Sequence, residues 1–189
     1  DRSRGLGDVY KRQGNESKCR FVYALHPFMN SPISFGSSYE SDLATLKAKY
    51  LQVIDAGCRQ IMLSADDADS PGADNYKRLL TDLTNWLHDL QQMKNEDGSF
   101  KYPGLKDTIP FVENKYYDAG ASGSWYNTLP ENVRVITTGK QVWGKADKST
   151  IDTFKSRTGV APFMWINWPC TDNTCLLYTS PSPRDRSVS

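Results

Sequence analysis

The chain has 189 residues, a formal net charge of +1 and 12% aromatic residues. This aromatic content is typical of a folded domain and argues against a disordered chain. No apolar run reaches the length of a membrane span, and the four cysteines include no C-x-x-C pair. We therefore expect neither a transmembrane helix, nor a disulfide framework, nor a zinc site.

Residues 1–13 and 175–189 are interpreted as translated sequencing-adapter artefact. The stretch SRGLGDVYKRQ (3–13) can be written in codons whose reverse complement, shifted by one base, translates as CLLYTSPSPRD (175–185). Peptides encoded by inverted copies of one DNA segment are typical of an insert read through its adapters, so both ends are set aside before fold reasoning. A chain that begins within a gene would have lost any signal peptide, so localisation is not readable from the termini.

Setting the ends aside changes the charge. They hold six of the 23 Lys/Arg and three of the 22 Asp/Glu, which leaves residues 14–174 with a net charge of −2. A basic tail for nucleic acid is therefore not supported.

Residues 14–174 alternate short apolar runs with helical patterns. CRFVYALHP (19–27) predicts a strand that ends at Pro27 and leads into a polar loop. Residues 39–58 carry apolar residues at helical spacing and predict a helix, with Ser41 or Asp42 as its N-cap and Gly57 as its stop.

The alternation continues to residue 169. Apolar runs predict strands within 59–67, 108–117, 132–139 and 161–169. Helical spacing predicts helices within 75–93 and 148–159, and a weak helical signal lies near 125–129.

Five strands with four helical or partly helical connections predict the α/β class with a parallel sheet. The sheet is either doubly wound or part of a (β/α)8 TIM-type barrel. No glycine-rich phosphate fingerprint is present, and polar residues crowd the carboxyl ends of the strands, which favours the barrel. These residues are His26, Asp66, Asp67, Asn114, Lys115, Tyr116, Thr137, Thr138 and Asn167.

The adjacent carboxylates of Asp66 and Asp67 follow an apolar strand in IMLSADDADS (61–70). An ionised carboxylate helps to keep its neighbour protonated, as a general acid requires. Asp and Ser before a helix are also common caps and turn formers. A calcium loop that includes Asp69 is a third interpretation, although the spaced ligand pattern is lacking.

A second group of residues lies in FMWINWPCTDN (163–173). Trp165 and Trp168 flank Asn167, and Asp172 follows. Aromatic faces beside amide and carboxylate groups suit a sugar, which offers C–H faces and hydroxyls. The alternative is that both Trp side chains belong to the core and Asp172 is a helix cap.

Five motifs, in order and spacing, resemble the catalytic barrel of glycoside hydrolase family 84. They are YALHP, LSADDAD, VENKYY, ITTGKQV and WINWPCTD, and they extend over most of residues 14–174. This family comprises β-N-acetylglucosaminidases, among them O-GlcNAcases and bacterial hyaluronidase-type enzymes. The double Asp and the W-x-N-x-P-x-x-D pattern are the specific features. The resemblance implies an incomplete barrel, with about five strands present and the first two and the last missing, so the chain alone is expected to be inactive.

The resemblance also implies retaining hydrolysis assisted by the substrate's own 2-acetamido group. Asp66 would hold the acetamido N–H, and Asp67 would act as general acid and then general base. Tyr116 would hydrogen-bond the acetamido group. The other matched residues would bind the sugar: Thr138, Val142 and Trp165 around the acetamido methyl, Asn167 in the sugar site, and Asp172 on O4 and O6.

The expected partners are N-acetylglucosamine-containing glycans or glycoproteins, without cofactor, metal or nucleic acid. The resemblance favours a secreted or cell-surface protein. Two departures bear on substrate fit, since Thr137 stands where the family usually has Trp, and residues 94–107 form an unusual insertion. The alternative function is a non-catalytic glycan-binding relative with the same barrel.

Overall fold

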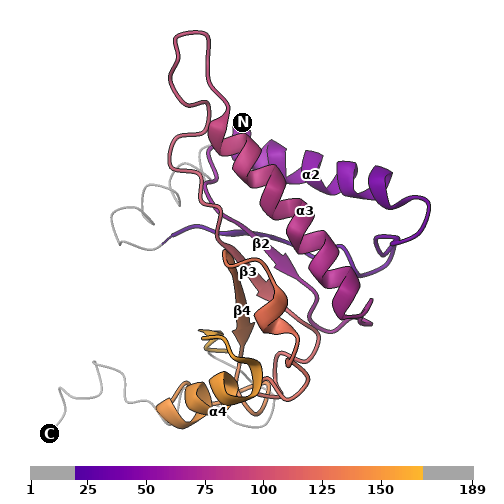
Figure 1. The fold of residues 1–189 in the computed structure, drawn as a ribbon, viewed down its shortest axis with the longest axis vertical. Helices are drawn as coiled ribbons and strands as arrows, with labels where there is room; N and C mark the ends of the chain where they lie inside the picture. Colours follow the sequence, from indigo (N-terminus) through magenta and orange to yellow (C-terminus); the bar gives the residue numbers. More distant parts are fainter. Residues whose placement is uncertain (1–19, 168–189) are drawn as a thin grey trace, which may run out of the picture. The chain divides into compact units, whose positions relative to one another are not determined.

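The computed structural model describes residues 20–167 (Figure 1). The chain divides into two compact units. The first unit comprises the chain up to Phe111 together with 129–134, and the second comprises 112–128 together with the chain from Val135.

Five strands form one sheet in the order β1-β2-β3-β4-β5. The strands are β1 (Tyr23–Leu25), β2 (Ile61–Ser64), β3 (Ile109–Val112), β4 (Val133–Thr137) and β5 (Phe163–Met164). Both β1 with β2 and β4 with β5 pair in parallel. All four residues of β3 are buried, as expected of a strand in the middle of a parallel sheet. The predicted α/β class with five strands is confirmed.

Two long helices cover the first unit's strands: α2 (Tyr39–Asp55) and α3 (Ala73–Gln92). Every third or fourth residue of α3 is buried, so its apolar stripe faces the core. The two helices are tied by the Tyr39 hydroxyl, which donates to Asp82 Oδ2 at 2.6 Å. Tyr50 of α2 donates to the Met62 carbonyl of β2 at 2.6 Å, and its burial raises the pKa of its phenol.

The predicted N-cap of α2 is wrong, whereas the predicted stop is confirmed. The helix begins at Tyr39, because the Asp42 N–H already donates to the Ser38 carbonyl. Ser41 donates its hydroxyl to that same carbonyl, and the Asp42 carboxylate accepts from the Ser34 N–H, so both side chains bond to the turn before the helix. Gly57, at φ +97°, ends the helix in a backbone conformation that glycine adopts readily.

The second unit contains the short 3-10 helix η1 (Tyr126–Thr128) and α4 (Lys148–Thr158). The Asp147 side chain caps α4 by accepting from the Thr150 N–H at 2.8 Å, and Gly159 ends it in the left-handed conformation. Phe154 of α4 stacks on the Tyr126 ring. Within residues 20–167, no helix is long and apolar enough to cross a membrane.

The 94–107 insertion begins as a small antiparallel hairpin that joins Lys94 and Phe100. Its return to the sheet is fixed by the Gln91 side chain, which donates to the Leu105 carbonyl, and by the Lys106 N–H, which donates to the Arg59 carbonyl. Figure 1 shows this segment extending beyond the end of α3.

Candidate active site

Asp66 and Asp67 lie in a turn directly after β2. Alternate residues of β2 are buried and Ala65 is fully buried, so the chain leaves the core at the first carboxylate. Asp66 is partly buried, whereas Asp67 is exposed and has φ +56°. A left-handed conformation is strained for a residue other than glycine and is most often tolerated by Asn and Asp.

His26 follows β1 and contacts this turn. Its Nε2 lies 2.6 Å from the Asp66 backbone carbonyl oxygen and 3.9 Å from Asp66 Oδ1. The side chains of His26 and Asp66 are 22% and 26% exposed, so the contact is mostly shielded from solvent. The two predicted strand ends are thus brought together within the first unit.

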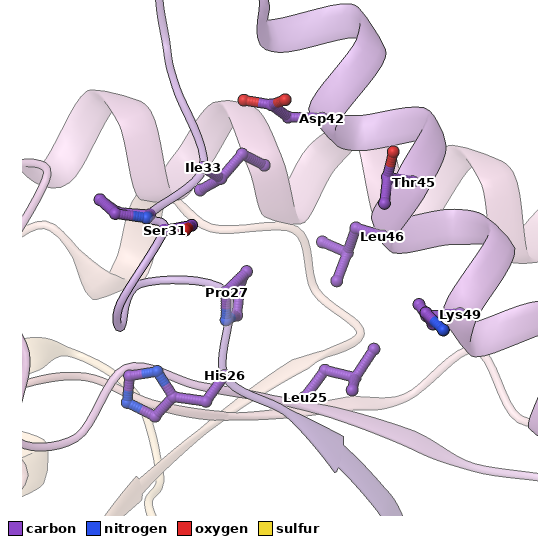
Figure 2. A pocket seen from close by; sticks show the side chains of 10 residues that line it. Leu25, His26, Pro27, Ser31, Ile33, Asp42, Thr45, Leu46 and Lys49 are labelled. Atoms are coloured by element: carbon purple, nitrogen blue, oxygen red, sulfur yellow. The ribbon is translucent and has the colours of Figure 1, made fainter.

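A cavity of about 350 Å³ lies beside the end of β1. It is lined by Leu25, His26 and Pro27, by the loop that follows, and by the α2 residues Asp42, Thr45, Leu46 and Lys49 (Figure 2). Neither Asp66 nor Asp67 lines it. His26, which lines the cavity and contacts Asp66, connects it to the turn that carries the carboxylate pair.

In the second unit, a buried carboxylate that the motif analysis did not single out follows β3. Glu113 is 5% exposed, and its Oε2 accepts from the Lys115 N–H at 2.7 Å and from the Tyr126 hydroxyl at 3.2 Å. Burial raises the pKa of this carboxyl, and the two hydrogen bonds offset part of the effect. The sequence signals for Glu113 are its place directly after the apolar run IPFV and its position within the motif VENKYY.

Tyr116 is buried in the turn that Glu113 begins. Its carbonyl accepts from the Thr138 N–H at 3.0 Å and from the Thr137 hydroxyl at 2.5 Å. The Tyr116 and Trp165 rings lie 5.3 Å apart, centre to centre, and tilted by 34°. The structure therefore brings together the predicted residues Tyr116, Thr138 and Trp165.

Two further predicted residues of the second unit also meet. Asn167 donates from its side-chain amide to the Val142 carbonyl at 3.2 Å. Thr137 is buried, and its hydroxyl also accepts from the Gly139 N–H at 3.0 Å, so it fixes the turn after β4. Asp172 and Trp168 lie outside the described residues.

The calcium alternative finds no geometric support in the described part of the chain. Among residues 20–167, no three His, Cys, Asp or Glu side chains are placed to hold a metal ion together.

The β-N-acetylglucosaminidase family model matches residues 8–183. The chain belongs to this family. The match extends over most of the sequence, and with the solved structures below it confirms the resemblance to glycoside hydrolase family 84.

Solved structures similar to this chain include CpGH84D, at 28% identity and a TM-score of 0.73. A mutant of the Thermobaculum terrenum O-GlcNAc hydrolase matches at 17% identity and a TM-score of 0.69, which supports the fold alone. The match covers 91% of this chain and 28% of CpGH84D, and 92% of this chain and 37% of the hydrolase. A search of the curated proteins found no significant match.

Proposed function

We propose that this chain is the catalytic part of a glycoside hydrolase that removes terminal β-linked N-acetylglucosamine. The observation that carries the proposal is the Asp66–Asp67 pair, in a turn after a buried β2 strand, in a chain of this family. Carboxyl ends of parallel strands are where barrel enzymes place their catalytic groups. The substrates would be N-acetylglucosamine-containing glycans or glycoproteins.

In the first step the acetamido oxygen of the substrate attacks C1. The C1–O bond to the leaving group breaks, Asp67 gives its proton to the departing oxygen, and an oxazoline-type intermediate forms. Asp66 accepts a hydrogen bond from the acetamido N–H and stabilises the positive charge that develops there. The exposure of Asp67 supports the acid role, because the leaving group and the later water must both reach it.

In the second step water attacks C1 from the side that the leaving group vacated. Asp67, now ionised, takes the proton of the water, the C1–oxygen bond of the intermediate breaks, and the acetamido group is restored. Two inversions at C1 give net retention.

By family resemblance, further residues of this chain would contact the acetamido group and the sugar. Tyr116 would hydrogen-bond the acetamido group, and Thr138, Val142 and Trp165 would line the space for its methyl. The packing of Tyr116 on Trp165 and the hydrogen bond from Thr138 to Tyr116 support a shared role for these three residues. Asn167, and by family resemblance Asp172, would bind the sugar hydroxyls.

The proposal is tested on the extended protein, which we define as this chain completed to the full length of the barrel. We expect it to hydrolyse aryl β-N-acetylglucosaminides with retention, as read by NMR of the first-formed anomer. Fluorine atoms on the acetyl group withdraw electrons from the attacking oxygen, so the rate should fall with each fluorine added. Rates that are insensitive to fluorination would contradict acetamido participation. Binding of N-acetylglucosamine without turnover would instead favour the non-catalytic glycan-binding alternative.

A further inference from the structure

We propose that His26 is a positioning residue that holds the Asp66–Asp67 turn through a hydrogen bond from Nε2–H to the Asp66 carbonyl. The proposal rests on the function proposed above and adds to it a residue to which none of the roles above is assigned. Its basis lies entirely within the first unit: the pairing of β1 with β2, the 2.6 Å contact and the backbone of Asp67.

Strand register brings the two groups together. β1 and β2 run parallel with Leu25 opposite Leu63, so His26 and the residues after Ser64 leave the sheet at the same edge. The pairing of β1 with β2 ends at Leu25, and Pro27, which has no N–H, cannot extend it beyond His26. The imidazole packs against Phe28, whose ring packs in turn on Tyr76 of α3, so the ring is held on one side by buried aromatic groups.

The contact defines the tautomer of His26. A backbone carbonyl can only accept, so Nε2 carries the proton. The other ring nitrogen, Nδ1, is buried and makes no hydrogen bond within the described residues. A proton on Nδ1 in place of Nε2 would leave a buried donor without a hydrogen-bond partner, which favours the Nε2–H tautomer.

This hydrogen bond acts at the peptide group that joins the two carboxylates. Asp67 has φ +56°, and such a conformation persists only where the surroundings enforce it. The carbonyl that His26 holds belongs to the peptide directly before Asp67, so its orientation affects the direction of both side chains. Asp66 Oδ1 lies 3.9 Å from Nε2, beyond hydrogen-bond distance, which leaves its carboxylate available to the acetamido N–H.

The first experiment reads the tautomer by NMR of the extended protein labelled with 15N-histidine. We expect the His26 ring to carry its proton on Nε2, with Nδ1 unprotonated, and spectra of His26→Phe and His88→Phe assign the signals. His88 is the matched control, because its half-exposed ring lies 3.5 Å from Asp107 on the surface of the first unit. A proton on Nδ1 with Nε2 bare would overturn the proposal.

The second experiment separates positioning from packing. His26→Phe keeps an aromatic ring but removes the donor, and we expect kcat to fall about tenfold to a hundredfold with KM changed less than about twofold. His26→Gln places an amide N–H near the position of Nε2 and should recover most of kcat. His88→Phe should leave both parameters unchanged.

Equal kcat values for His26→Phe and the wild type would overturn the positioning role. Equal losses in His26→Phe and His26→Gln would do so as well, because they would point to ring shape alone. If the wild-type extended protein shows no turnover, the function proposed above fails. The positioning role of His26 is then tested by its tautomer and by the NMR chemical shift of the Asp67 backbone amide. That chemical shift should change in His26→Phe and stay near its wild-type value in His26→Gln.

Discussion

Two adjacent carboxylates can act differently because their surroundings differ. Asp66 is partly buried beside His26, whereas Asp67 is exposed in a left-handed turn. In the extended protein we expect Asp67→Asn to lower kcat/KM for substrates with poor leaving groups by about 10²–10⁴-fold, the usual contribution of a general acid. Activated aryl glycosides should lose far less, because a good leaving group needs little proton assistance.

Asp66→Asn should lower kcat/KM for both substrate classes by similar factors, since it weakens the internal nucleophile. The control is Asp69→Asn, an exposed carboxylate of the same stretch, which should leave both rates unchanged. Equal sensitivity of both substrates to Asp67→Asn and Asp66→Asn would rule out distinct roles. The comparison uses kcat/KM because that quantity reports the first step.

Glu113 predicts a pH dependence of stability. Burial raises its pKa above the ordinary value of 4.5, with Asp118 raising it further and the Lys115 N–H, the Tyr126 hydroxyl and the Lys115 charge lowering it. The folded state therefore binds this proton more tightly than the unfolded state, so the stability contributed by Glu113 falls as pH rises from about 4.5 through the raised value. Glu113→Gln removes the titration.

Relative to the wild type, Glu113→Gln should therefore be more stable at pH 7 than at pH 4. The free energy of unfolding of the variant minus that of the wild type should be larger at pH 7. Urea denaturation of the extended protein at both pH values measures it. Glu131→Gln, at an exposed site, should show no such trend. A relative stability that decreases with pH would mean that Glu113 is held ionised, not desolvated.

At single residues, sequence reasoning named candidates only where a short motif contains them, and the roles of those candidates stay predictions. The positions of Asp66, Tyr116 and Trp165 were named from short patterns. Glu113 was missed because its burial depends on the Tyr126 hydroxyl, thirteen residues away, and a glutamate after an apolar run ordinarily marks the return to solvent.

At the scale of elements, α4 packs against the turn before η1 through a glycine. Gly120 has φ +77°, and a Cβ added there would lie 2.5 Å from Thr158 Cγ2 and 3.0 Å from Phe154 Cδ2. Gly159 has a similar φ of +74°, but its nearest neighbour would be Asn127 Cβ at 3.5 Å, an ordinary contact. A side chain at Gly159 would meet only backbone strain, whereas a side chain at Gly120 would meet backbone strain and a steric clash with α4. Comparing variants at the two positions therefore distinguishes the two costs.

We expect Gly159→Ala to lower the free energy of unfolding by about 1–2 kcal/mol, the cost of a left-handed alanine. Gly120→Ala should add a further penalty of about 1–3 kcal/mol for overpacking against α4. Urea denaturation of the extended protein measures both. Equal losses in the free energy of unfolding of the two variants would show that α4 can move away from residue 120 without destabilising the fold, which would contradict close packing at Gly120.

Apolar runs predicted the strands and helical spacing predicted the helices of the described residues, because a fully buried strand and a helix with one buried face leave these two patterns in the sequence. The start of α2 was misplaced by this reasoning. Three serines and an aspartate lie near it, and the choice among them depends on which carbonyl the Asp42 N–H reaches, a three-dimensional detail. The fold class could be predicted because consecutive strands separated by helices have few alternatives to a parallel sheet.

At the scale of the whole chain, the proposed adapter origin of residues 1–13 and 175–189 makes a direct prediction. Segments that did not evolve with the domain should contribute no selected contacts. Removing them from the chain should therefore change the urea midpoint and any binding of N-acetylglucosamine by no more than the measurement error. A loss above about 1 kcal/mol on trimming, the size of a typical mutational effect, would contradict this origin.

The last prediction concerns the 189-residue chain by itself. Its described sheet has β1 and β5 as outer strands, and exposed apolar side chains accompany both, with Phe21 56% exposed near β1, and Phe163 44% and Ile166 62% exposed at β5. Outer strands with unpaired backbone groups and apolar neighbours favour association with other chains. The chain also spans 28% of the length of CpGH84D.

We therefore expect the chain alone to associate and to lack N-acetylglucosaminidase activity, although it contains Asp66 and Asp67. Catalysis needs the sugar held so that its acetamido oxygen meets C1, and a partial binding site supplies too little binding energy for that distortion. Size-exclusion chromatography with an aryl β-N-acetylglucosaminide assay, on this chain and on the extended protein, provides the comparison. Turnover by a monodisperse 189-residue chain would show that the described strands suffice to hold the sugar.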